Sequence, residues 1–239
     1  MEILSMEGWY LTLRWFHFLS GITWIGILYY FNFIQTPFFA TELGGQAKSA
    51  MTRGLVPHAL WWFRWGAMVT FLTGWLIVLT KLFHDKQPLT NGYMTLILTG
   101  GLMGTFMWYN VWFVIGPAQR KAIASAEAVA SGGDADPEAA KLAPSAGLAS
   151  RTNTLFSIPM LFFMGSASHF GALHPVMGGV SGYWVVALIL ILAVEANALI
   201  GAKGLAPQKY ITTPSPRGVI HAGFGLALLL YLNASFMLS

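Results

Sequence analysis

Six long stretches of mainly apolar residues divide the chain, and most polar residues lie in the segments between them. A helix that crosses a bilayer requires about 20 mainly apolar residues. That length is reached at roughly 9–35, 58–83, 93–117, 153–171, 182–201 and 217–237. The pattern predicts an all-α fold, a polytopic integral membrane bundle of about six transmembrane helices that forms a single domain over residues 1–239.

Basic residues are divided unequally between the two ends of these segments. The connections between the first and second, third and fourth, and fifth and sixth segments hold most of the Lys and Arg. Because cytoplasmic loops carry this excess, we expect both termini on the opposite side, in the periplasm of a bacterial inner membrane. The longest connection, 118–151, is rich in Ala, Ser and Gly and is predicted to be a cytoplasmic loop. Within it, Ala122–Ala130 and Pro137–Leu142 have the composition of short surface helices.

The composition agrees with a membrane protein and limits its cofactors. Hydrophobic residues make up 56% of the chain and charged residues 9%, against about 25% charged residues in a soluble domain. The lipid bilayer is therefore the expected surrounding, and soluble enzymes and nucleic-acid-binding domains are excluded. The chain has no cysteine, which excludes disulfides, thiolate-held iron–sulfur clusters and covalent c-type haem. A redox cofactor would have to be held by His, Met or carboxylate side chains.

Four histidines are candidate metal ligands, because an ionisable residue inside a span costs roughly 2.5–3.5 kcal/mol and usually marks a functional site. Each lies in a different segment, with a glycine on or beside the same helix face: His17, His58, His169 and His221. Imidazole is a common axial ligand of haem iron, and glycine leaves room for a flat macrocycle. By their expected depth, His17 and His169 form an outer pair, and His58 and His221 form an inner pair. A second interpretation remains open, in which glycine lets two helices approach and histidine hydrogen-bonds across their interface.

The first segment carries further candidates for the same site. Arg14, Gly21 and Trp24 share one helix face with His17. We expect them to line the cofactor site, where Arg14 either neutralises a haem propionate or extends to the lipid headgroups. The cofactor expected there is haem b, one or two groups, bound without a covalent link.

Arg64 and Glu195 lie deep in the second and fifth segments, at comparable depths in the cytoplasmic half. A lone charge at such a depth is hard to tolerate. We therefore expect either that Arg64 pairs with Glu195, or that Arg64 contacts a propionate while Glu195 contacts His221.

Two further patterns predict contacts between helices. Asn110 and Asn197 are expected to hydrogen-bond from one helix to another, since an amide inside a span requires a partner. Gly100 and Gly104 form a face of small residues, which is typical of close helix packing.

Five groups of residues, in order over roughly 9–171, together resemble a known family: Arg14-Trp15-Phe16-His17 with Gly21–Gly26, Trp62-Phe63-Arg64-Trp65, Gly104-Thr105-Phe106-Met107 with Pro117–Lys121, Asn153-Thr154-Leu155, and Ser168-His169. The family is that of the membrane-anchored urate oxidases, also called urate hydroxylases. Its members join a membrane domain to a C-terminal cytochrome c domain and are implicated in oxidising urate, with electrons passed to the respiratory chain. The resemblance implies that His17 and His169 are functional. It also implies that this cysteine-free chain is the membrane domain without the cytochrome c domain, so that a c-type partner comes from another chain.

These observations lead to one preferred functional hypothesis and two alternatives. The preferred one is a haem b-binding electron-transfer protein, an oxidoreductase or a subunit of one, that works with a cytochrome c or a quinone and is linked to urate-type oxidation. Other membrane subunits or a second copy of the chain are further expected partners. The first alternative is a non-catalytic accessory or structural subunit of a larger membrane redox complex. The second is a small-molecule transporter, which ranks last because the sequence has no broken spans or inverted repeats.

Overall fold

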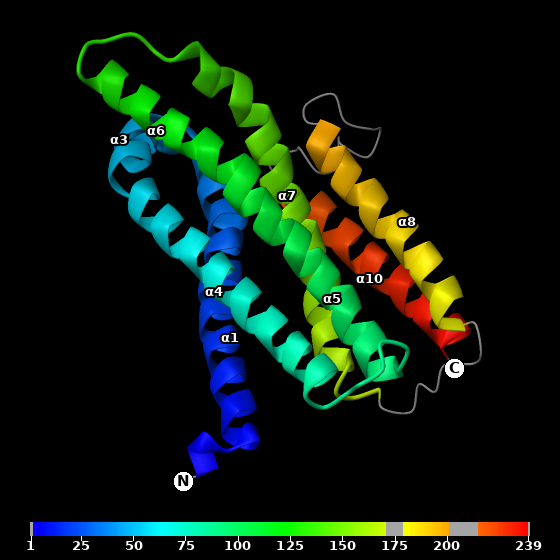
Figure 1. Cartoon of the computed structure of the whole chain (residues 1–239). Coiled ribbons are helices and arrows are strands. Elements are labelled where there is room, and N and C mark those ends of the chain that lie inside the picture. The colour runs from blue at the N-terminus through cyan, green and yellow to red at the C-terminus, as the bar shows by residue number, and fades with distance from the viewer. Residues whose placement is uncertain (1, 171–178, 201–214, 239) are drawn as a thin grey trace.

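The structure, a computed structural model, describes residues 2–170, 179–200 and 215–238. Within these ranges every regular element is a helix (Figure 1). η1 is a 3-10 helix and η2 and η3 are π-helices. The elements are η1 (Glu2–Leu4), α1 (Met6–Tyr29), η2 (Tyr30–Gln35), α2 (Thr36–Phe39), α3 (Glu42–Gly54), α4 (Val56–Phe83), α5 (Gly92–Tyr109), η3 (Asn110–Ile115), α6 (Gly116–Ala130), α7 (Pro137–Ser166), α8 (Gly179–Ile200) and α10 (Arg217–Met237).

Four helical segments among the described residues are long and apolar enough to cross a membrane: Met6–Phe39, Val56–Phe83, Gly179–Ile200 and Arg217–Met237. The first joins α1, η2 and α2 into one continuous helical run. The chain is therefore an all-helical membrane protein, and four of the predicted spans coincide with these segments. The helices over the other two predicted spans, 93–117 and 153–171, fall outside this set, so the total of six and the sides of the termini stay predictions.

The prediction that 118–151 is a loop was wrong, whereas its location on the cytoplasmic side stays a prediction. α6 continues to Ala130 and α7 begins at Pro137, so only residues 131–136 connect two long helices that pack on each other. Alanine is the strongest helix former, which lets both helices extend beyond their apolar parts. Asp136 starts α7 by accepting a hydrogen bond from the Glu138 backbone N–H, and proline fits the first helical turn. The short helices expected at Ala122–Ala130 and Pro137–Leu142 are the ends of these longer ones.

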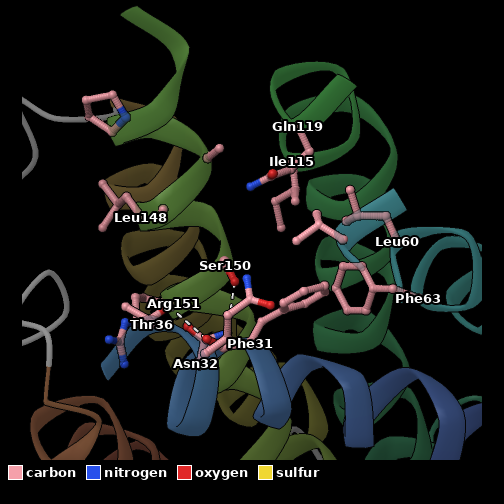
Figure 2. A pocket seen from close by; sticks show the side chains of 15 residues that line it. Phe31, Asn32, Thr36, Leu60, Phe63, Ile115, Gln119, Leu148, Ser150 and Arg151 are labelled. Carbon is pink, nitrogen blue, oxygen red and sulfur yellow. Dashed lines mark hydrogen bonds between the residues drawn. The ribbon is translucent and has the colours of Figure 1, made fainter. Parts of the chain in front are cut away.

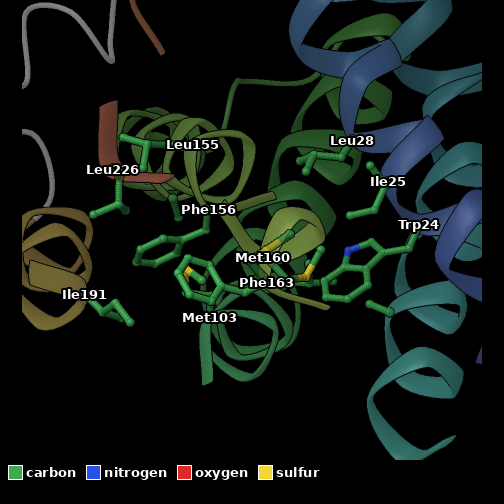
Figure 3. Packing of buried hydrophobic residues seen from close by; sticks show 14 of the residues in the cluster. Trp24, Ile25, Leu28, Met103, Leu155, Phe156, Met160, Phe163, Ile191 and Leu226 are labelled. Carbon is green, nitrogen blue, oxygen red and sulfur yellow. The ribbon is translucent and has the colours of Figure 1, made fainter. Parts of the chain in front are cut away.

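α7 lies at the centre of the bundle. α1 packs on α4 in one pair, α5 and α6 pack along one side of α7, and α10 and α8 pack along another (Figure 1). Large apolar side chains from these helices meet in one core, which Figure 3 shows from close by: Trp24 from α1, Met103 from α5, Phe156 and Phe163 from α7, Ile191 from α8 and Leu226 from α10.

Glycines let other helices approach α7 closely. A Cβ atom on Gly100 of α5 would lie 2.8 Å from Met164 Cγ and 3.1 Å from the Met160 carbonyl oxygen. A Cβ atom on Gly104 would lie 3.5 Å from Met160 Sδ. The close packing predicted from Gly100 and Gly104 is thereby confirmed.

Two π-helical turns, η2 and η3, each end two residues before a proline. The Thr36 N–H donates to the Phe31 carbonyl, and the Gly116 N–H donates to the Val111 carbonyl, so each bond spans five residues. Pro37 and Pro117 follow directly. A proline ring clashes with the carbonyl four residues before it, and a wider turn relieves that clash without breaking the helix. π-helical turns are often found at functional sites, and both of these turns contact α7.

Candidate functional site

A cavity of about 450 Å³ lies beside α7 (Figure 2). It is at the end of the bundle that leads to the connections rich in Lys and Arg. Its walls come from η2, the beginning of α4, the junction of η3 with α6, and the part of α7 from Pro144 to Arg151. Small-molecule sites have volumes of about 300–1,000 Å³ and occur between the helices of bundles. The volume and the position are within the range found for small-molecule sites.

Amide and hydroxyl groups line this cavity from opposite sides. Asn32 of η2 donates from Nδ2 to Ser150 Oγ at 2.9 Å and to the Leu28 carbonyl at 2.9 Å. Gln119 of α6 extends toward the cavity from the opposite wall (Figure 2). The Gln35 Oε1 atom is buried and has no hydrogen-bond partner among the described residues. A buried acceptor without a partner is costly, and a bound N–H donor would satisfy it.

Two aromatic rings form an apolar wall of the cavity. Phe31 of η2 and Phe63 of α4 meet edge to face, with ring centroids 5.9 Å apart and an interplanar angle of 89°. Amides that donate and accept, together with flat rings, suit a small planar molecule with carbonyl and N–H groups.

Arg151 borders the cavity but does not point into it. Only 5% of the residue is exposed, and burial lowers the pKa of its guanidinium. An arginine stays protonated nonetheless, so it adds a positive charge to this end of the bundle. Figure 2 shows the guanidinium directed away from Phe31 and Phe63, on the other side of α7.

A second cluster of polar side chains contacts α7 and is buried. Asn110, the first residue of η3, donates from Nδ2 to Asn153 Oδ1 at 3.0 Å and to Glu195 Oε2 at 3.1 Å. Asn153 donates in turn to the Met107 carbonyl at 2.9 Å. Asn110 and Asn153 are fully buried, and Glu195 is 2% exposed. This cluster, called the closed amide network below, joins η3, α7 and α8.

Of the two expectations for Arg64 and Glu195, the structure tests the pair and the contact with His221, while contact between Arg64 and a propionate stays a prediction. The predicted pair between them was wrong, because α8 packs on α5, α7 and α10, whereas Arg64 lies over the ring of Trp112 at 4.4 Å. The described partner of Glu195 is Asn110. The prediction that Asn110 links helices is confirmed, and Asn197 is buried on the same helix as Glu195.

The four candidate histidines lie apart in the fold. His17 lies against α4, where Nδ1 is 3.1 Å from Thr73 Oγ1. His169 follows the end of α7, with Nδ1 2.8 Å from the Gly165 carbonyl oxygen. His58 and His221 lie on exposed faces of α4 and α10, and these helices are separated by α5 and α7 (Figure 1).

Glycines beside the histidines make room for helix contacts. A Cβ atom on Gly74 would lie 3.0 Å from Cε1 of His17, and one on Gly21 would lie 3.9 Å from Thr70 of α4. For His17, the structure therefore agrees with the alternative given from the sequence, in which glycine lets two helices approach and the histidine hydrogen-bonds across their interface. A haem between two histidines requires both imidazoles at one gap, and the described residues do not fit that arrangement within one chain.

Arg14 and Trp24 are also separated from one another. Arg14 is exposed and lies over the ring of Tyr10 at 5.7 Å, whereas Trp24 is 1% exposed and belongs to the apolar core. Sequence reasoning missed the amides of the cavity, Asn32, Gln35 and Gln119. The available signal was an asparagine inside an apolar span, followed five residues later by a proline.

No curated protein and no solved structure matches the chain. Residues 86–202 match the family model described as urate oxidase N-terminal. The matched part includes α5, η3, α6, α7 and α8, and so contains the closed amide network and two walls of the cavity, the junction of η3 with α6 and the part of α7 from Pro144 to Arg151. The resemblance inferred from sequence motifs agrees with this match, although its first two groups of residues lie before the matched part. Over residues 86–202, just under half of its length, the chain is similar to the urate oxidase N-terminal family.

Proposed function

We propose that this chain is a membrane oxidoreductase subunit that binds a small planar molecule of the urate class in the cavity beside α7. Electrons from the substrate would pass to a partner, a cytochrome c or a quinone. The observation that carries the proposal is the wall of amides and aromatic rings around a cavity of about 450 Å³. The family match supports urate as the first ligand to test.

Urate is a flat molecule with carbonyl acceptors and N–H donors around its edge. Side-chain amides can satisfy both kinds of group. Asn32 and Gln119 on opposite walls, with the free Oε1 of Gln35, offer such contacts, and Phe31 and Phe63 offer apolar surface to the flat ring. The buried charge of Arg151 favours an anion at this end of the bundle without contacting it.

Calorimetric titration of the purified chain in nanodiscs with urate tests the proposal. We expect saturable binding, and a Gln119→Leu variant should weaken it about tenfold, the effect of losing one or two hydrogen bonds. Gln46→Leu is the matched control, because Gln46 is exposed on α3 and away from the cavity. No binding, or equal binding by both variants, would contradict the proposal and favour the accessory subunit.

Haem b stays a prediction, and no step of the proposal runs through it. Bound non-covalently, it would supply one-electron transfer. An absorption spectrum of the purified chain, oxidised and reduced, with a pyridine haemochrome assay, tests for it directly. A preparation that binds urate and has no Soret band would place the electron carrier in a partner.

The location proposed is a bacterial inner membrane with both termini in the periplasm. The lack of native cysteine makes single-cysteine labelling unambiguous. A thiol reagent that cannot cross the membrane should label Glu2→Cys on intact spheroplasts and Ser131→Cys only after permeabilisation. The reverse pattern would invert the proposed topology.

A further inference from the structure

Arg64 is held in a fixed position on α4 by contacts with two other elements. Its guanidinium carbon lies 4.4 Å from the centroid of the Trp112 ring in η3. A Cβ atom on Gly116 of α6 would lie 3.5 Å from Arg64 Nε, so the glycine makes room for the arginine. The Nε atom is buried without an acceptor among the described residues. The stack covers a face of the guanidinium and leaves its terminal N–H groups for an acceptor.

Arg120 brings a second positive charge to the same place. It follows Gly116 by four residues on α6 and so lies on the same helix face. Arg64 Nε lies beside Gly116, so Arg120 is one helical turn from the residue that Arg64 packs on. Within the described part of the chain, neither has a carboxylate within 4.0 Å, whereas neighbouring Lys121 has Asp136 at 3.9 Å. Two like charges held together without a counter-charge favour binding of an anion.

Packing places this arginine pair nearer to the end of a span than the position of Arg64 in the predicted span 58–83 indicated. Arg64 Nε lies beside Gly116, next to the end of the predicted span 93–117. Three tryptophans on α4 are exposed beside it, Trp61 by 54%, Trp62 by 58% and Trp65 by 47%. Tryptophan is enriched at the interface between headgroups and acyl chains. The site is also on the side where basic residues predominate.

We propose that Arg64 and Arg120 bind the phosphate of an anionic phospholipid in the leaflet on the basic side. Guanidinium groups bind phosphate through paired N–H donors, and basic pockets between helices on the cytoplasmic side bind anionic headgroups. The exposed tryptophans provide a surface for the glycerol and the upper acyl chain. The site is separate from the cavity and does not depend on the proposed substrate.

Native mass spectrometry of the full chain, titrated with phosphatidylglycerol or phosphatidylcholine in detergent, tests the proposal. The first lipid adduct should form with phosphatidylglycerol at a concentration at least about fivefold lower than with phosphatidylcholine. Arg64→Gln and Arg120→Gln should each weaken the phosphatidylglycerol adduct about fivefold. Lys121→Gln is the matched control, because its charge is adjacent in sequence and already paired with Asp136. It should leave the adduct unchanged.

Two further measurements separate binding from folding and from free phosphate. Arg120 is exposed, so Arg120→Gln should keep the melting temperature of the unsubstituted chain. Inorganic phosphate at the lipid concentration should not displace the adduct, because it lacks the apolar contacts. Equal adducts with both lipids, unchanged adducts in both arginine variants, or displacement by inorganic phosphate would each overturn the proposal.

Discussion

η2 and η3 are two π-helical turns of similar construction whose asparagines have different surroundings. Each turn ends two residues before a proline, and each carries an asparagine that bonds to α7. Asn32 of η2 bonds to Ser150 at the wall of a cavity, whereas Asn110 of η3 bonds to Asn153 and Glu195, and all three residues are buried. The same local structure, a π-helical turn that carries an asparagine, therefore borders a cavity in one place and belongs to the closed amide network in the other. The predictions below test that difference.

The largest effect is expected from Asn110→Leu. The substitution removes the donor for Asn153 Oδ1 and for Glu195 Oε2 and leaves both acceptors buried. We expect a loss of about 2–4 kcal/mol in the free energy of unfolding, since each unsatisfied buried group costs about 1–3 kcal/mol. Reversible denaturation in detergent measures it. A loss no greater than that of Asn32→Leu would show that the two turns do not differ in this way.

Close packing around α7 gives the next largest effect. Gly100→Ala introduces a Cβ atom 2.8 Å from Met164 Cγ, and we expect a loss of about 1–3 kcal/mol in unfolding free energy. Gly101→Ala is the control on the adjacent residue, because no atom other than those of its chain neighbours and its own helical backbone lies within 4 Å of its Cβ position. That variant should gain up to about 1 kcal/mol from the better helix propensity of alanine. Similar changes in both variants would contradict tight packing of α5 on α7.

Asn32→Leu should have a smaller effect on stability. Ser150 Oγ loses its donor, but it borders a cavity that water can enter. We expect about 1 kcal/mol of lost stability and, in the same preparation, weaker urate binding by calorimetry. If Asn32→Leu destabilises the protein strongly and leaves urate binding intact, the turn is structural and the open site is not a ligand site.

The smallest effect is expected from Asp85→Asn, a substitution outside both π-helical turns that changes how stability depends on pH. The hydrogen bond from His84, with a further one from Tyr10, holds the pKa of the Asp85 carboxyl below its usual range. Stability from this carboxylate is therefore present above the ordinary aspartate pKa and is lost as the pH falls through the lower pKa of the folded state. The melting temperature in detergent should fall slightly less on acidification in Asp85→Asn than in the unsubstituted chain. Identical acid profiles would show that Asp85 does not contribute.

Much of the fold followed from the sequence, because an apolar stretch of about 20 residues inside a bilayer has to satisfy its own backbone hydrogen bonds as a helix. The interhelical role of Asn110 and the packing role of Gly100 were predictable, since an amide inside a span requires a partner and small residues permit close approach. The hairpin of α6 and α7 was missed, because a low-hydrophobicity stretch with two glycines looks like a loop. The cavity was missed because Gln119 lies far in sequence from Asn32 and Gln35 and none of the three carries a charge.

The sequence by itself determined a helical membrane protein without thiol chemistry, and its motifs indicated the family that the match over 86–202 supports. Those properties depend on composition and on local residue order. Only the tertiary structure decided which polar residues meet, because that depends on which helices are neighbours. Glu195 meets Asn110 and not Arg64, since α8 lies against α5 and α7. His17 meets Thr73 and not a second histidine, since α1 pairs with α4.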